Sequence, residues 1–390
     1  MRNLAEIVTV KSVEDITYNG KHYDNIVHVT LNENAFDFTT QRGCKVGDYM
    51  VFIGEGSLIP ASNKNFEFLR ARCYKEQYDA FAIKPMKLAG IISMGLLRPV
   101  DVLPRGKKYK VGQDVTDVLG IKKLEDLEDA SPKKEKNVFK CFMYKYLPKI
   151  ARLIWGRNKE SQEYPSWLIS KTDETNLENI PEQLDKYYGS TWYVTAKMEG
   201  QSATFILEKN KFYVCSRNVA YKKNDGSRLW KVAEKYDIEK VLRRFYEKTG
   251  IHLAIQGELC GPDIQKNIYK FTDYHLFIFN AKDLDHNKYL DYDELVLLCK
   301  FYGLEMVPVL KDGILLSEFI TKDTIDKVRD EFVETLSFTI ETEEKIAHHN
   351  DLVIDNKGVF HDEGVVIRTK DMKFSCKLKS REYALWFSGK

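Results

Sequence analysis

Short runs of β-branched and aromatic residues, separated by turn-forming residues, fill the first third of the chain. They occupy residues 7–10, 26–31 and 49–53, and the turn signals between them are Asn19-Gly20 and Val46-Gly47-Asp48. Closely spaced strands divided by such turns are typical of a small antiparallel barrel or sandwich. We therefore predict a β-rich domain over residues 1–125.

The clearest pattern in the chain is a pair of apolar runs on either side of one lysine. Residues 192–196 and 201–207 are rich in β-formers, and Lys197 and the step Glu199-Gly200 lie between them. This predicts a strand, a tight turn and a second strand, with Lys197 at the end of the first. A lysine is a nucleophile only when burial or cationic neighbours disfavour its protonated form, whose reference pKa is about 10.4. Lys197 is therefore a candidate nucleophile.

The remaining segments predict a linker and two helices. Composition changes abruptly over residues 126–165, where an acidic and a basic run lead into a basic, aromatic segment. We interpret that segment as a linker with helices packed on one of the domains; the alternative is a clamp that binds nucleic acid. Residues 292–303 predict a helix ending at Gly303, and residues 321–334 predict another. A second domain is expected over residues 166–390.

Composition and charge exclude several classes of protein. The chain has 390 residues, of which 43% are hydrophobic and 30% charged, with a net charge of +2, as in an ordinary soluble protein of two or three domains. Any affinity for nucleic acid must then come from local patches. Seven scattered cysteines without a Cys-x-x-Cys pair argue for reduced thiols and against structural zinc. With no membrane-spanning stretch expected, we predict a cytoplasmic protein.

A lysine followed three residues later by glycine is by itself a weak signal. The chain contains five such lysines: Lys87, Lys186, Lys197, Lys223 and Lys300. The flanking strands favour Lys197, whereas Lys223 lies in a polar turn. Further segments follow Lys197 in a fixed order: Ser216-Arg217-Asn218, Gln256-Gly257-Glu258, 276–280, 363–368 and Lys377-Leu378-Lys379.

This ordered series resembles the nucleotidyltransferase motifs of polynucleotide ligases and mRNA capping enzymes, and is most similar to those of ATP-dependent RNA ligases. Residues 46–48, 66–70, 90–96 and 112–120 resemble the N-terminal OB domain of one branch of these ligases. The resemblance implies an α+β protein. It would have an N-terminal OB-type β-barrel, followed by a nucleotidyltransferase domain built on antiparallel sheets with flanking helices.

The resemblance also implies a role for each motif residue. Lys197 would form lysyl-AMP from ATP, Arg217 would contact the ribose, and residues 170–174 and 176–179 would line the adenine pocket. Phe279 would stack on adenine, with Val365 or Val366 on the other side, although Phe279 could equally be a core residue like neighbouring Phe277. Lys377 and Lys379, two positions apart on a predicted strand, project from one face and can meet the α-phosphate.

Three carboxylates are expected around the nucleophile. By resemblance Glu199, Glu258 and Glu363 would hold a hydrated Mg²⁺ or Mn²⁺ against the α-phosphate, and both ions prefer oxygen ligands. Glu258 and Glu363 would contact the nucleotide as well. The implied cofactors are therefore ATP and a divalent cation.

The implied reaction joins the 3′-hydroxyl and 5′-phosphate ends of RNA, as in RNA repair. The expected partners are RNA ends in nicked duplexes or structured RNA, and we expect a monomer. Residues 66–72 and 83–97 predict apolar strands interrupted by basic residues. These basic residues lie either on solvated strand faces or on a surface that faces RNA. The alternative enzyme is an mRNA capping guanylyltransferase that uses GTP, and a third possibility is a binding protein without catalysis. Few residues follow Lys379, where capping enzymes carry an OB domain, and this favours the ligase.

Overall fold

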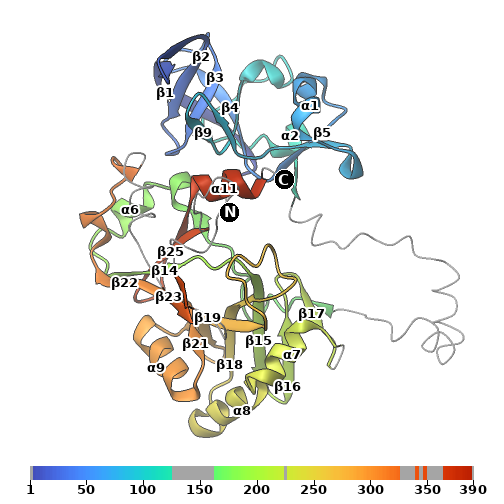
Figure 1. The fold of residues 1–390 in the computed structure, drawn as a ribbon, viewed down its shortest axis with the longest axis vertical. Coiled ribbons are helices and arrows are strands. Elements are labelled where there is room, and N and C mark those ends of the chain that lie inside the picture. The colour runs from blue at the N-terminus through green and yellow to red at the C-terminus, as the bar shows by residue number, and fades with distance from the viewer. Residues whose placement is uncertain are drawn as a thin grey trace, which may run out of the picture.

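The computed structural model describes residues 3–124, 162–223, 226–325, 339–341, 346–348 and 363–388. Figure 1 shows two β-rich parts, the N-terminal part at one end and the larger part below it, with helix α11 (Arg381–Ser388) between them. Most of the linker segment predicted over residues 126–165 and most of the helix predicted over 321–334 lie outside the described residues.

The N-terminal part is a curled antiparallel sheet with a second small sheet beside it. Strand β1 (Ala5–Tyr18) pairs over its first half with β4 (Tyr49–Gly54) and over its second half with β2 (Lys21–Leu31). The five-stranded order is completed by β3 (Asp37–Gln41) and β10 (Gly95–Pro99). The second sheet contains β5 (Ser57–Pro60), β6 (Tyr74–Lys75), β7 (Ala80–Ala82) and β11 (Lys122–Lys123). The three strands predicted first are confirmed.

The strand predicted within residues 66–72 is wrong. These residues form a 3₁₀ helix, η1 (Lys64–Leu69), and a short α-helix, α1 (Arg70–Cys73). Phe66, Leu69 and Cys73 are all buried in one core, at the spacings of three and four residues that put side chains on one helical face. The alternation of basic and apolar residues concealed this spacing.

A large sheet forms one wall of the second part. Its inner strands are β17 (Val219–Tyr221), β16 (Lys211–Cys215), β15 (Gln201–Glu208), β18 (Leu253–Cys260) and β19 (His275–Asp283). Its edges are β12 (Gln162–Glu163) beside β17, and β20 (Lys288–Tyr289) and β21 (Glu305–Met306) beside β19. Helices α7 (Arg228–Lys235), α8 (Ile238–Thr249) and α9 (Tyr292–Tyr302) bury their apolar faces against it. Helix α9 ends before Gly303, whose φ is +67°, so that predicted helix is confirmed.

A five-stranded sheet forms the facing wall. Its order is β13 (Thr175–Asn176), β26 (Ser375–Lys379), β25 (Gly364–Thr369), β14 (Trp192–Ala196) and β22 (Val309–Ile314). Every residue of β14 and β25 is buried. The predicted strand, turn and strand around Lys197 are confirmed, but β14 and β15 belong to different sheets. Lys197 therefore lies where the chain crosses from one wall to the other.

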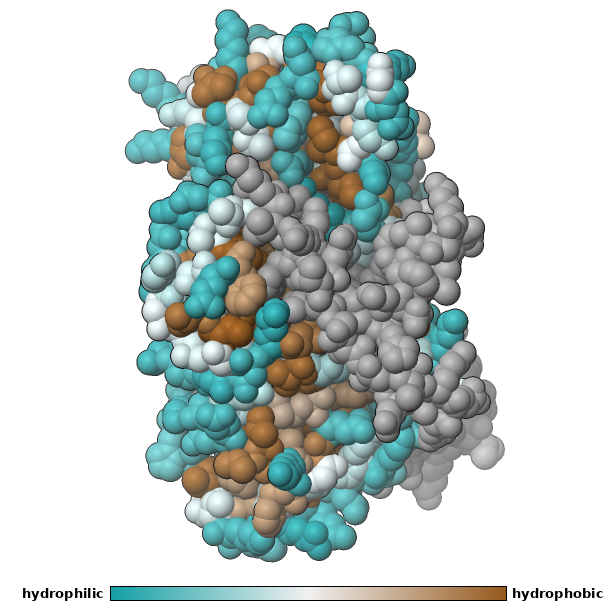
Figure 2. Space-filling model, turned by 60° about the vertical axis from the view of Figure 1, so that its left-hand side comes forward, coloured by the Kyte–Doolittle hydropathy of each residue, from teal (hydrophilic) through white to brown (hydrophobic). Residues whose placement is uncertain are grey.

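The fold is α+β, with a curled N-terminal sheet domain followed by a sheet-rich domain with flanking helices, as expected. Figure 2 shows brown apolar residues in separate patches between teal hydrophilic ones on that face of the molecule. In the described part of the chain, no helix combines the length and the apolar character needed to cross a membrane.

Candidate active site

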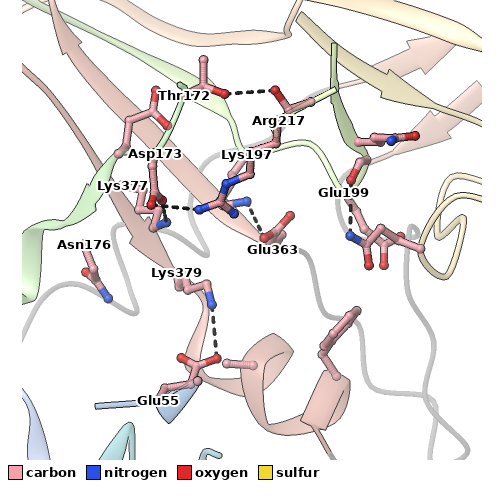
Figure 3. A pocket seen from close by; sticks show the side chains of 18 of the residues that line it. Glu55, Thr172, Asp173, Asn176, Lys197, Glu199, Arg217, Glu363, Lys377 and Lys379 are labelled. Atoms are coloured by element: carbon pink, nitrogen blue, oxygen red, sulfur yellow. Dashed lines mark hydrogen bonds and ion pairs between the residues drawn. The ribbon is translucent and has the colours of Figure 1, made fainter. Parts of the chain in front are cut away.

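A cavity of about 1500 Å³ lies between the two facing sheets and the N-terminal domain. The ends of β14, β19, β25 and β26, helix α11, and the turn between β4 and β5 all contribute to its lining. Of the site residues predicted from sequence, Lys197, Glu199, Arg217, Glu258, Phe279, Glu363, Lys377 and Lys379 all line this cavity. Figure 3 shows Lys197, Arg217, Glu363, Lys377 and Lys379 converging from segments far apart in the chain.

Lys197 is held at the end of β14 by the neighbouring strand. Its backbone N–H donates to the carbonyl of Gly364 at 2.8 Å, and its Nζ forms an ion pair with Glu363. Gly364 has a φ of +124°, and a Cβ there would lie 2.2 Å from the carbonyl oxygen of Leu378. Only glycine fits such a close approach of two strands. The close approach of the strands at Gly364 thus places Glu363, the residue before it, beside Lys197.

Lys377 and Lys379 project from one face of β26, as their spacing predicts. Cys376 and Leu378 alternate with them and are buried in the core of the five-stranded sheet. Burial lowers the pKa of Lys377, and the charges of Lys197 and Lys379 lower it further. The three amines therefore form a group that favours binding of an anion.

Asp173 links three cations and was not assigned a role from the sequence. Its carboxylate lies 3.0 Å from Arg217, 3.6 Å from Lys377 and 3.4 Å from Lys123 of the N-terminal domain. Figure 3 shows Asp173 between Arg217 and Lys377. The only indication in the sequence that Asp173 belongs to the site was its position within the motif 170–174. That motif predicted contacts with the nucleobase rather than with the phosphates.

Glu258 and Glu363 fit a divalent cation. Burial raises the pKa of Glu258 to about 8, and the carboxylates of Glu363 and Glu174 raise it while Lys197 and Arg217 oppose this. A nearby cation would let Glu258 ionise at neutral pH, and a set of oxygen donors suits Mg²⁺ or Mn²⁺. Among the described residues, no three His, Cys, Asp or Glu side chains meet as a ready set of ligands. An ion here would therefore keep water among its ligands.

Glu199 has different partners from those expected of a residue beside the metal. Its carboxylate accepts hydrogen bonds from the backbone N–H groups of Lys266, at 3.3 Å, and Ile268, at 3.0 Å. It also accepts one from the Tyr383 hydroxyl, at 3.1 Å. In Figure 3 Glu199 lies apart from Lys197 and Glu363. The carboxylate of Glu199 thus connects the loop that follows β18 to helix α11 through hydrogen bonds.

The region expected to bind a nucleobase combines an aromatic ring with buried polar groups. Phe279 and Val366 line the cavity, whereas Phe277 and Val365 belong only to the cores. The guanidinium of Arg368 lies 5.5 Å from the centre of the Phe279 ring and 2.8 Å from the carboxylate of Glu174.

Asn176 and Glu178, both in the expected adenine-pocket motif, are hydrogen-bonded to each other. The Asn176 side-chain amide donates to the Glu178 carboxylate at 3.2 Å and accepts from the Glu178 backbone N–H at 3.1 Å. Asn176 lines the cavity but is largely buried, whereas Glu178 is fully buried and paired with Arg381. This pair therefore connects the cavity wall to the contact with helix α11.

Contacts between the domains form the other border of the cavity. Lys379 pairs with Glu55 of the β4–β5 turn at 3.2 Å. Arg381 pairs with Asp37 of β3 at 2.6 Å and with Glu178 at 2.7 Å, and Lys87 pairs with Glu382 at 2.8 Å. Sequence reasoning missed all of these, because no local pattern relates a residue of one domain to a residue of the other.

Family models match two separate parts of the chain. Residues 190–381 match the family model described as RNA ligase, and residues 4–100 match a model described as an OB-fold domain. None of the curated proteins that were searched matches the sequence.

Solved structures of one RNA ligase have the same fold. The Naegleria gruberi RNA ligase with PPi has a TM-score of 0.76 and 24% identity, and covers 100% of both chains. A mutant of that ligase with ATP and Mn has a TM-score of 0.73 and 23% identity, and covers 100% of this chain and 99% of its own. A mutant with AMP and Mn has a TM-score of 0.73 and 24% identity, with 98% of each chain covered. At this identity the likeness establishes the fold.

Proposed function

The chain belongs to the RNA ligase family and carries an N-terminal OB-fold domain, and from this premise we propose that it joins RNA ends by way of a lysyl-AMP intermediate. In the proposed sequence, Lys197 takes AMP from ATP and pyrophosphate leaves. The AMP then passes to the 5′-phosphate of one RNA end. The 3′-hydroxyl of the other end attacks that activated phosphate, which completes the seal and releases AMP.

The observation that carries this proposal is the meeting of four cations with two carboxylates in one cavity. Lys197 follows β14, Arg217 follows β16, and Lys377 and Lys379 lie on β26, while Glu258 and Glu363 line the same cavity. Such a group offsets the charge that a phosphate group develops in the transition state. A cavity lined by these cations and also by Phe279 and Val366 suits a nucleotide.

The first step can be assigned to side chains of this chain. The Nζ of Lys197 attacks the α-phosphorus of ATP, an N–P bond forms, and the bond from that phosphorus to the bridging oxygen of pyrophosphate breaks. Glu363, in contact with Nζ, is placed to receive its proton. Lys377 and Lys379 stand where they can meet the α-phosphate, and Arg217 where it can meet the ribose.

Glu258 and Glu363 would hold the divalent cation. When bound, Mg²⁺ or Mn²⁺ supplies positive charge at the phosphates. We leave Glu199 out of this set, because its carboxylate already accepts three hydrogen bonds. The Naegleria gruberi structures with Mn support the choice of a divalent ion.

A labelling experiment tests the nucleotide and the lysine together. The protein is incubated with Mg²⁺ or Mn²⁺ and radioactive ATP or GTP, and the modified peptide is identified by mass spectrometry. We expect AMP on the peptide that contains Lys197, and no adduct on Lys197→Ala. Lys186→Ala is the matched control, because Lys186 also precedes a glycine by three residues but lies in helix α6 (Gln183–Lys186). An adduct with GTP alone would indicate a guanylyltransferase, and an adduct on Lys197→Ala would exclude this nucleophile.

The proposed substrates are RNA ends in nicked duplexes or structured RNA, as in repair. Lys75, Lys84 and Lys123 of the N-terminal domain line the same cavity and can reach RNA phosphates close to the site. Sealing is measured on a panel of nicked duplexes and single strands with RNA or DNA on either side. Faster sealing of nicked RNA duplexes is expected, and equal rates on every substrate would contradict this preference.

A further inference from the structure

We propose that Glu55 of the N-terminal domain competes with the phosphate groups of the substrate for Lys379, and so weakens the hold of the site on ATP and on pyrophosphate. This inference rests on the proposed function, since it concerns the same site. It makes Glu55 a residue that sets substrate affinity from outside the catalytic domain.

Glu55 is presented to the cavity by a turn that the backbone fixes in place. Three consecutive N–H groups donate to distant carbonyls: Gly54 to Leu4 at 2.9 Å, Glu55 to Met94 at 3.3 Å, and Gly56 to Ile83 at 2.9 Å. Gly56 also has a φ of +80°, which glycine adopts without strain. The carboxylate therefore points at Lys379 from a rigid support, as Figure 3 shows.

The cations of the cavity are paired with carboxylates. Lys197 pairs with Glu363, while Lys377 and Arg217 share Asp173. These partners belong to the catalytic domain. Lys379, at 3.2 Å from Glu55, is the member of this group whose carboxylate partner comes from the N-terminal domain.

A carboxylate and a phosphate compete for the same ammonium group because both are oxyanions that accept charge-assisted hydrogen bonds. A triphosphate carries more charge and can displace Glu55, but the carboxylate then remains close to the bound phosphates. Lys379 and Glu55 are each about a quarter to a third exposed, so water screens the repulsion without removing it. The consequence is weaker binding of ATP and also of pyrophosphate.

Weaker binding of pyrophosphate has a chemical advantage. Adenylylation of Lys197 is reversible, because retained pyrophosphate can attack lysyl-AMP and restore ATP. The carboxylate of Glu55 stays close to the bound phosphates, and its charge repels the pyrophosphate that forms, which favours release of pyrophosphate. The pair thus promotes the forward reaction at the expense of affinity for ATP.

The test compares Glu55→Gln with Glu67→Gln in the full-length protein. Glu67 also forms an ion pair in the N-terminal domain, with Arg70, but lies outside the cavity. Two concentrations are measured: ATP at half-maximal rate of adduct formation, and pyrophosphate at half-maximal removal of AMP from the adenylylated protein. We expect Glu55→Gln to lower both about two- to fivefold, the range for a partly exposed ion pair, and Glu67→Gln to change neither.

A double-mutant cycle with Lys379→Met separates competition from a general structural effect. If Glu55 acts through Lys379, Glu55→Gln has no effect on either concentration in the Lys379→Met background. Unchanged or raised concentrations in Glu55→Gln would overturn the inference, and so would the same decrease in both backgrounds.

Failure of the proposed function would look different. In that case the wild-type protein forms no nucleotide adduct, whatever residue stands at position 55. Binding of pyrophosphate to wild-type and Glu55→Gln protein, measured by calorimetry, then decides the present inference alone: tighter binding to Glu55→Gln supports it, and equal or weaker binding overturns it.

Discussion

The two borders of the cavity are built differently. On the side enclosed by the two facing sheets, cations pair with carboxylates of their own domain, as in Arg368 with Glu174 and Lys197 with Glu363. On the side that faces the OB-fold domain, the pairs join two domains, as in Lys379 with Glu55 and Arg381 with Asp37. The first border holds most of the residues to which the proposed chemistry is assigned. The second connects the remaining one, Lys379, to the N-terminal domain through an ion pair.

The largest expected effect concerns the side of the cavity between the two facing sheets, which we call the enclosed border. We expect Lys377→Ala to slow formation of the lysyl-AMP adduct about a hundred- to a thousandfold, because the variant loses a partly buried charge that would stabilise the developing phosphate charge. The rate is measured by single-turnover labelling with ATP. Lys373→Ala is the control, since Lys373 lies on the exposed turn between β25 and β26. Equal rates for the two variants would remove Lys377 from the chemistry.

The next effect concerns the border between the domains. Arg381 is buried between Asp37 and Glu178, and Glu178 is fully buried. Arg381→Ala leaves Glu178 without this cation, and we expect a loss of about 3–5 kcal/mol in the free energy of unfolding. Lys87→Ala breaks an exposed pair across the same border and should cost at most about 1 kcal/mol. Denaturant titrations measure both, and similar costs would mean that burial does not distinguish these contacts.

The smallest effect depends on pH. A hydrogen bond to Asp37 raises the pKa of His28 against the opposing effect of burial, and the charges of Asp37 and Glu14 raise it further. A raised pKa in the folded state gives stability that is complete below the unfolded value of about 6.5, and that is lost as pH rises through the folded value.

The His28 contribution is measured by comparing wild-type protein with His28→Gln across this range. The free energy of unfolding of the wild type, relative to His28→Gln, should fall between about pH 6 and pH 8 by less than about 1 kcal/mol. A constant difference would show that protonation of His28 adds nothing to its contact with Asp37.

The strands and site residues of the enclosed border could be predicted from the sequence because they follow local patterns of apolar and charged residues. Continuous runs of β-forming residues identify β14 and β25, and the alternation along β26 places Lys377 and Lys379 on one face. Helix α9 was predicted because its terminal glycine is a local signal. The roles assigned to these site residues remain predictions, as do the domain boundaries at 125 and 165 and the monomeric state.

The remaining features depend on contacts between distant segments. Nothing near Glu55 or Lys123 in the sequence shows that they approach Lys379 and Asp173. Glu199 was expected beside the metal from its place after Lys197, but its partners come from the loop after β18 and from α11. The strand prediction for residues 66–72 was wrong for another reason. Basic residues lie between the buried positions and conceal their helical spacing.

The place of β25 in the five-stranded sheet has a consequence for biosynthesis. This strand lies between β14 and β26, yet the ribosome makes β25 and β26 long after β14. N-terminal domains usually fold first during translation. The growing chain can therefore complete its first domain while the sheet that carries Lys197 still lacks its middle strand and both lysines of β26. A nascent ligase would be unable to trap nucleotide until almost all the described residues have left the ribosome.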